Sequence, residues 1–232
     1  MGVICLFAFP SAGSSKVMYK GFEKYLNDQI DFIPLEFAGR GERVKDDFFK
    51  NMDEVIEDLL PRIEYKSKNM PFAFLGHSLG ALIAYYLALK LQDNNLTSPR
   101  HLFLSGRKNP VVSKKESLYH KLRPYEMKDL LLKLGGTPKE LLDDDNFLGF
   151  ILPIIKADFQ LLSQFNISYF KKKKLNCDIT VLNGEDDNLI KEKIDWNYAT
   201  NSTCDYFLFN GGHFFINDFK KEIADIIKSK IL

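Results

Sequence analysis

Cysteine is scarce in this chain of 232 residues, and its positive and negative charges nearly cancel. The three cysteines, Cys5, Cys177 and Cys204, are odd in number and show no Cys-x-x-Cys spacing. The sequence therefore predicts neither a disulfide framework nor a zinc site, and we expect no metal ion. The 32 basic and 31 acidic side chains leave a net charge of +1. That balance does not support nucleic-acid binding.

Long apolar segments are also missing. The sequence has no run of eighteen uninterrupted apolar residues, and its opening residues do not combine basic residues, an apolar segment and a small-residue cleavage site. We therefore expect no membrane-spanning segment and a cytoplasmic location. The length and a hydrophobic share of 45% suit a single domain over residues 1–232 with a sizeable core.

Strand-like and helix-like patterns alternate along most of the chain. The sequence predicts six strands, at residues 3–9, 30–37, 72–75, 101–104, 179–182 and 206–209. Apolar residues at helical spacing predict helices after the third strand and at residues 17–26, 52–63 and 220–231. Such alternation is typical of an α/β fold, in which a mostly parallel central sheet is flanked by helices on both faces.

Residues 113–171 interrupt this alternation. They contain no convincing strand but several helix-like pieces, among them 118–134 and 147–165, with a turn at 135–138. The piece at 147–165 is apolar on more than one helical face, so it must bury against two partners, for example the main domain and a ligand. The pattern alone leaves two interpretations open, plain core helices or a helical lid inserted in the domain.

One stretch combines a strand, a tight turn and a helix. Residues 72–87 place Gly76-His77-Ser78-Leu79-Gly80 between an apolar strand and an uninterrupted apolar helix. In a Gly-x-Ser-x-Gly elbow the sharp turn lifts the serine hydroxyl clear of the sheet, where a histidine can reach its proton. The two glycines leave room for neighbouring backbone in so tight a turn. Ser78 is therefore the predicted nucleophile.

Only four histidines are available to serve as the base. His77 lies inside the elbow and cannot easily bend back to the serine, while His101 and His120 lie at a strand start and in the helical insertion. His213 alone follows a late strand, directly after two glycines. Because the order along such hydrolases is serine, acid, histidine, we predict His213 as the general base.

Three carboxylates, Glu185, Asp186 and Asp187, compete for the position of the acid after the fifth strand. We predict Asp187, because it stands three residues beyond the turn glycine Gly184 and three before an apolar residue. That spacing is the usual arrangement of the acid loop in this fold. Asp186 is the alternative.

Two backbone N–H groups must stabilise the oxyanion of a tetrahedral intermediate. Leu79, the residue after the nucleophile, supplies one of them, and its place at a helix N-terminus helps because the helix dipole favours a negatively charged oxygen there. The loop after the first strand, Phe9-Pro10-Ser11-Ala12-Gly13, supplies the other, and we predict Ala12. An ordinary β-to-α turn would use the same small side chains.

Seven short blocks, spread over nearly the whole chain, resemble those of a known family in the same order. The family is the stand-alone type II thioesterases of polyketide and nonribosomal peptide synthesis, which have the α/β-hydrolase fold and are related to the medium-chain thioesterase of animal fatty-acid synthesis. Ala38 stands where the family usually has proline, and Ser14 where it commonly has glycine. The blocks are Phe9-Pro10-Ser11-Ala12-Gly13, Gly39-Arg40-Gly41-Glu42-Arg43, Gly76-His77-Ser78-Leu79-Gly80, Ser105-Gly106-Arg107, Leu134-Gly135-Gly136-Thr137-Pro138, Ala157-Asp158-Phe159 and Gly211-Gly212-His213-Phe214-Phe215.

The resemblance implies a function. It makes residues 113–171 a mobile lid, and the substrate an acyl or aminoacyl thioester on the phosphopantetheine arm of a carrier protein, so that the enzyme needs no cofactor of its own. The implied role is editing, the removal of aberrant or stalled acyl groups, and we expect a monomer. Lys114, Lys115, Lys121 and Arg123 are candidates for docking an acidic carrier protein.

Two other functions are compatible with the same residues. A carboxylesterase or lipase acting on free esters would share the three catalytic side chains. A hydrolase-fold binding protein without catalysis would normally have lost one of them.

Overall fold

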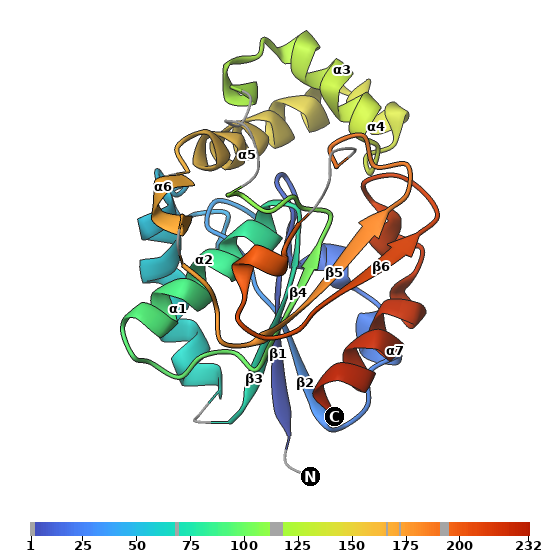
Figure 1. Cartoon of the computed structure of the whole chain (residues 1–232). Coiled ribbons are helices and arrows are strands. Elements are labelled where there is room, and N and C mark those ends of the chain that lie inside the picture. The colour runs from blue at the N-terminus through green and yellow to red at the C-terminus, as the bar shows by residue number, and fades with distance from the viewer. Residues whose placement is uncertain (1–2, 68–69, 112–117, 166, 172, 191–194) are drawn as a thin grey trace.

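The computed structural model describes residues 3–67, 70–111, 118–165, 167–171, 173–190 and 195–232 (Figure 1). Its centre is a six-stranded sheet with the strand order β2-β1-β3-β4-β5-β6, in which all five neighbouring pairs are parallel. The predicted α/β fold is confirmed, and each predicted strand is present. The strands are β1 (Ile4–Phe9), β2 (Ile30–Pro34), β3 (Phe72–His77), β4 (His101–Ser105), β5 (Asp178–Gly184) and β6 (Cys204–Phe209).

Helices cover both faces of the sheet, as Figure 1 shows. Along β1, Cys5, Phe7 and Phe9 pack on one face against α1 (Met52–Ser67) and α2 (Leu79–Asp93). The alternate side chains of β1 pack on the other face, against α7 (Lys220–Ile231). Every residue of β1, β3 and β4 is buried, which explains why these strands are apolar runs without polar alternation.

The helix predicted at residues 17–26 is wrong. The structure has two short 3₁₀ turns there, Lys16–Tyr19 and Phe22–Lys24, separated by Gly21 at φ +94°. Tyr19 and Phe22 are nevertheless fully buried, and the Tyr19 hydroxyl donates a hydrogen bond of 2.7 Å to the carbonyl of Phe9. The apolar spacing predicted the buried side chains correctly, but the chain leaves the helical conformation at Lys20 (φ −56°, ψ +129°) and is left-handed at Gly21, so no continuous helix forms.

The segment that interrupts the alternation is helical in the part the structure describes, and it covers the end of the sheet to which the strands point (Figure 1). Its helices are α3 (Pro124–Leu134), α4 (Lys139–Leu142), α5 (Asp145–Ser163) and α6 (Ile167–Phe170). The predicted absence of strands holds for residues 118–165 and 167–171. The expected start of the segment, which includes Lys114 and Lys115, lies outside the described residues.

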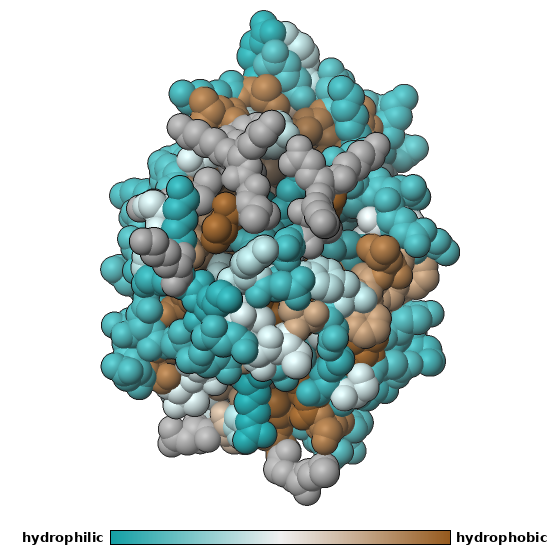
Figure 2. All heavy atoms as spheres, in the orientation of Figure 1, coloured by the Kyte–Doolittle hydropathy of each residue, from teal (hydrophilic) through white to brown (hydrophobic). Residues whose placement is uncertain are grey.

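The buried residues of helix α5 lie along one broad face, and the helix is not buried on every side that its sequence makes apolar. Ile154, Leu161 and Leu162 are buried, whereas Phe150 is 56% exposed. Hydrophobic residues reach the surface in this upper region (Figure 2). Within the described chain, α5 alone is long and apolar enough to cross a membrane, but core helices pass the same test of length and composition. Its middle carries a buried, charge-paired aspartate, so it does not indicate a membrane span.

Candidate active site

The sequence predicted an elbow at Ser78, and the structure has a sharp turn there. Strand β3 ends at His77 and helix α2 begins at Leu79, so one residue connects them. Ser78 has φ +55° and ψ −110°, a conformation that L-residues rarely adopt. Its N–H donates a hydrogen bond of 2.8 Å to the carbonyl of Ser105 at the end of β4. Strain of this kind, of the order of 1–3 kcal/mol, persists only where the surrounding structure enforces it.

The two elbow glycines are sterically required. A Cβ on Gly76 would lie 2.3 Å from the carbonyl oxygen of Gly80, and a Cβ on Gly80 would lie 2.0 Å from the carbonyl oxygen of Phe9. Both contacts are with backbone, which cannot rotate away. Gly80 therefore lets helix α2 approach the end of β1 and the loop that follows it.

Gly80→Ala should lower the free energy of unfolding by about 3 kcal/mol, because the methyl group must push two backbone segments apart. Chemical denaturation measures the change. Gly149→Ala is the matched control: Gly149 lies in helix α5 and a Cβ there would meet no atom within 4 Å. That control should be neutral or stabilising by up to about 1 kcal/mol. Similar destabilisation by both changes would contradict the steric argument.

The predicted base and the predicted acid are in contact. His213 lies in the loop after β6 and Asp187 in the loop after β5, and His213 Nδ1 is 2.6 Å from Asp187 Oδ2. Both side chains are buried, whereas Asp186 is exposed. The second oxygen of Asp187 accepts the N–H of Leu189 at 2.9 Å, which fixes the carboxylate. The geometry thus favours Asp187 over Asp186 as the partner of His213.

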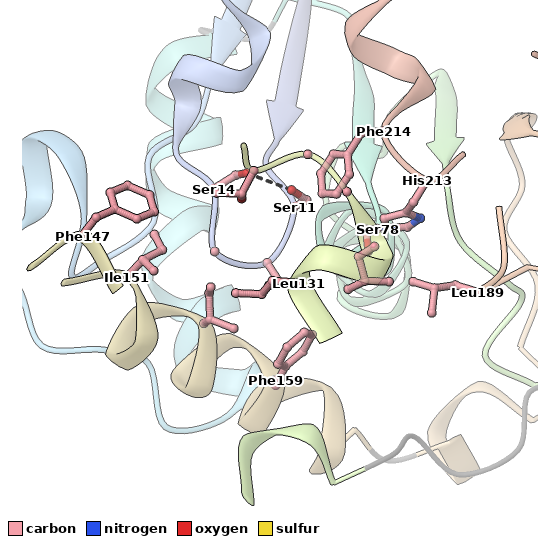
Figure 3. A pocket seen from close by; sticks show the side chains of 17 residues that line it. Ser11, Ser14, Ser78, Leu131, Phe147, Ile151, Phe159, Leu189, His213 and Phe214 are labelled. Carbon is pink, nitrogen blue, oxygen red and sulfur yellow. Dashed lines mark hydrogen bonds between the residues drawn. The ribbon is translucent and has the colours of Figure 1, made fainter. Parts of the chain in front are cut away.

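Ser78 and His213 line one pocket, whose volume is about 170 Å³ (Figure 3). Most of its other walls are apolar and come from the segment above the sheet. Helix α3 contributes Leu131, and helix α5 contributes Phe147, Ile151, Ile155 and Phe159. A pocket with apolar walls and a few convergent polar groups is the usual form of a small-molecule site.

The two predicted oxyanion donors come from two different elements near this serine. Ala12 lines the pocket, in the loop after β1, and Leu79 is the first residue of α2. Among the hydrogen bonds between described residues, none uses the amide of Ala12 or of Leu79. Both N–H groups therefore remain available to an oxygen atom of a ligand.

Comparison with known proteins identifies the family. The model of the thioesterase domain matches residues 5–231. This chain belongs to the thioesterase domain family. It is accordingly a thioester hydrolase, and the resemblance seen in its sequence blocks is confirmed.

Relatives match this thioesterase along its length. The medium-chain S-acyl fatty acid synthase thioesterase of Rattus norvegicus is 32% identical over 99% of this chain and 87% of its own. A Brevibacillus parabrevis protein named linear gramicidin dehydrogenase LgrE is 31% identical over 98% of this chain and 88% of its own. Among solved structures, ClbQ from the colibactin NRPS/PKS pathway has a TM-score of 0.90 and 29% identity, covering 99% of this chain and 97% of ClbQ.

The name dehydrogenase has no counterpart in the sequence of this thioesterase. A dinucleotide-binding sheet carries Gly-x-Gly-x-x-Gly after its first strand, where the backbone approaches the pyrophosphate. The loop after β1 reads Pro10-Ser11-Ala12-Gly13-Ser14-Ser15 and lacks that spacing. Within the described residues of the thioesterase, no group of three or more His, Cys, Asp and Glu side chains could hold a metal ion, and the three cysteines are free.

His77 is the neighbour of the site that the sequence did not reveal. Its ring centroid lies 4.9 Å from that of His213, and its Nδ1 is 2.9 Å from the hydroxyl of Ser105. The pKa of His77 lies well below its ordinary value, mainly because the side chain is completely buried and to a smaller extent because His213 is nearby. The thioesterase therefore keeps a neutral imidazole beside the predicted base, and that imidazole adds no positive charge to repel a protonated His213.

Proposed function

We propose that this thioesterase hydrolyses acyl or aminoacyl thioesters carried on the phosphopantetheine arm of a carrier protein, with Ser78, His213 and Asp187 as its catalytic triad. The 2.6 Å contact between buried Asp187 and His213, at a pocket that Ser78 also lines, is the observation that carries this proposal. A carboxylate on Nδ1 keeps the proton there, so Nε2 is free to accept the serine proton.

The reaction runs through an acyl-enzyme. Ser78 Oγ attacks the thioester carbonyl while His213 takes its proton, and the carbonyl oxygen becomes an oxyanion that the N–H groups of Ala12 and Leu79 stabilise. The C–S bond then breaks, and His213 returns the proton to the leaving thiol. A water molecule repeats the sequence on the serine ester, which releases the carboxylic acid and restores Ser78.

The apolar pocket supports an acyl substrate. The walls from α3 and α5 stand beside Ser78, so an acyl chain esterified to the serine can lie against them (Figure 3). We infer that the helical segment acts as a lid over this chain and that the enzyme edits stalled or aberrant acyl groups. The cytoplasmic location, the monomeric state and independence of a cofactor remain predictions from the sequence.

The carrier protein would meet basic side chains near the beginning of the lid. Lys121 is exposed, in a 3₁₀ turn that packs on α5, where Tyr119 and Phe159 are in ring contact at 5.4 Å. Arg123 donates to Glu126 at 2.8 Å and lies over the ring of Tyr125, so part of its charge is already engaged. Of these two described candidates, Lys121 is the better one for an acidic partner.

An acyl carrier protein should be hydrolysed with a higher kcat/KM than the same acyl group on CoA. The advantage should shrink as salt rises, because the Debye length falls from about 10 Å at 0.1 M to about 3 Å at 1 M. Lys121→Glu should remove much of the advantage. Lys66→Glu is the matched control, since Lys66 is exposed near the end of α1, which leads to the start of β3 at the end of the sheet opposite the lid. Equal kcat/KM for both substrates at low salt would remove the carrier protein from the proposal.

A p-nitrophenyl ester of the same acyl chain tests the esterase alternative in the same experiment. Both substrate types would form the same acyl-enzyme, so the difference lies in the recognition of the leaving group. A higher kcat/KM for the free ester than for either thioester would favour a carboxylesterase.

A further inference from the structure

Arg40 and Asp158 form a buried ion pair outside the triad. Arg40 Nη1 lies 2.5 Å from Asp158 Oδ2 and Nη2 lies 2.7 Å from Oδ1, so the contact is bidentate. The two residues are 3% and 1% exposed. Arg40 belongs to the loop after β2 and Asp158 to the middle of α5. A buried ion pair often adds little to the free energy of unfolding, because desolvation of the two charges offsets their attraction. We therefore looked for another role for this pair in the contacts around it.

Both members of the pair also hold the loop after β1. Asp158 Oδ2 accepts the N–H of Gly13 at 2.7 Å, and Arg40 Nη1 donates to the carbonyl of Ser14 at 3.2 Å. The N–H of Ser14 in turn donates to the carbonyl of Ser11 at 3.1 Å, which closes a β-turn with Ala12 and Gly13 at its centre. The ion pair therefore fixes this turn through two backbone groups that follow Ala12, the N–H of Gly13 and the carbonyl of Ser14.

Helix α5 touches the same turn with an apolar side chain. A Cβ on Gly13, which has φ +74°, would lie 2.6 Å from Ile155 Cγ1. Ile155 also lines the pocket, together with Ile151 and Phe159 one helical turn before and after it. One helix thus forms the wall against which an acyl chain would lie and, through Asp158, fixes the turn that carries Ala12.

We propose that Arg40 and Asp158 are positioning residues that hold the Ala12 N–H in its place in the pocket that Ser78 lines. Their ion pair connects helix α5, the loop after β2 and the turn that carries Ala12. An acyl chain that lies against α5 would therefore be next to the Ala12 N–H, whose position the same helix fixes through Asp158. This inference rests on the proposed function, in which Ala12 donates to the oxyanion. Misplacing such a donor weakens binding of the transition state and leaves binding of the substrate nearly unchanged.

Two double variants test the proposal. Arg40→Met with Asp158→Asn removes both charges but leaves an amide oxygen that can accept the Gly13 N–H. Arg40→Met with Asp158→Leu removes both charges and that acceptor too. The side chains introduced at position 158 are close in size. The Arg40 charge, which attracts the neighbouring carboxylate of Glu36, is lost in both variants and so does not distinguish them. The two variants therefore differ mainly in the hydrogen bond to the oxyanion turn.

The measured quantities are kcat and KM for an acyl-CoA thioester and the inhibition constant of a boronic acid with the same chain, which forms a tetrahedral adduct on a catalytic serine. Losing one oxyanion donor costs about 10²–10³-fold in kcat in a serine protease. We expect the leucine double variant to lose about 100-fold in kcat and in affinity for the boronic acid, with KM within about threefold of wild type. The asparagine double variant should stay within about tenfold of wild type in kcat. Equal kcat for the two doubles would overturn the proposal.

Arg40→Lys decides the question if the leucine double variant does not fold. Lysine keeps the positive charge but cannot form the bidentate contact and reach Ser14 as well. A fall of about tenfold in kcat at unchanged KM supports positioning, and wild-type kcat overturns it. Wild-type hydrolysis of the thioester, together with its loss in Ser78→Ala, separates failure of this inference from failure of the proposed function.

Discussion

Replacing Ser78 with alanine should lower kcat for thioester hydrolysis by about 10⁶-fold, the scale seen when the nucleophile of a serine protease is removed. Without the hydroxyl no acyl-enzyme can form, and only the binding pocket and the oxyanion donors remain to favour the reaction over water. The fold should be unaffected, because alanine meets the same backbone strain at φ +55° as serine does.

The test pairs steady-state kinetics with covalent labelling. An alkyl fluorophosphonate should add one phosphonyl group to the wild type and none to Ser78→Ala, as intact mass would show. Ser14→Ala is the matched control, because Ser14 is a second pocket serine whose hydroxyl lies 3.0 Å from that of Ser11. It should keep most of its activity and its label. A wild type that stays active and unlabelled would contradict the acyl-enzyme mechanism.

Asp187→Asn should lower kcat by about 10⁴-fold, as the corresponding change does in a serine protease triad. An amide at this place can offer an N–H to His213 Nδ1, which moves the imidazole proton to Nε2 and leaves nothing to accept the proton of Ser78. The carboxylate also stabilises the imidazolium that forms during attack, and an amide cannot. KM should change little, since Asp187 is buried behind the histidine.

Asp186→Asn is the control for this prediction, because it makes the same chemical change one residue away at an exposed side chain. Its kcat should remain within about twofold of wild type. The pair of variants separates an orienting acid from a loop of general importance. A larger loss at Asp186 than at Asp187 would move the role of the acid by one residue.

The sequence could indicate which side chains lie at the site because that indication depends on order and spacing along the chain. His213 was found by elimination among four histidines, and Asp187 by its distance from Gly184. The structure brings this histidine and this aspartate together from the loops after strands β5 and β6. These strands are parallel neighbours, so the loops that follow them begin side by side at the same end of the sheet. Their catalytic roles remain predictions.

The contacts that the sequence did not predict join segments with no fixed spacing. Arg40 and Asp158 appeared in two family blocks without a role, although they are paired across the molecule. Asp158 lies in a mainly apolar helix that also carries Asp145 and Lys156, so its charge alone did not single it out. His77 was likewise dismissed as a base, and its packing against His213 depends on how two loops meet.

Local conformation was the weaker part of the sequence analysis. Apolar spacing predicted a helix at residues 17–26, where the chain forms 3₁₀ turns around Gly21. The same spacing gave α1 and α7 correctly, because no left-handed glycine interrupts them. Apolar periodicity therefore predicts which side chains are buried, while the backbone dihedral angles decide whether the segment forms an α-helix or short 3₁₀ turns.

The parallel order of the sheet also shapes the folding of this protein. Strands β1 to β4 come from the first 105 residues, but β4 pairs with β5 only when residues 101 and 178 meet across the whole helical segment. Closing so long a loop has a large entropic cost and tends to slow folding. Ser78 lies before this gap, and Asp187 and His213 lie after it. We therefore expect the N-terminal four strands to assemble first, with enzymatic activity returning only when β5 and β6 dock, so that recovered turnover marks the last step of refolding.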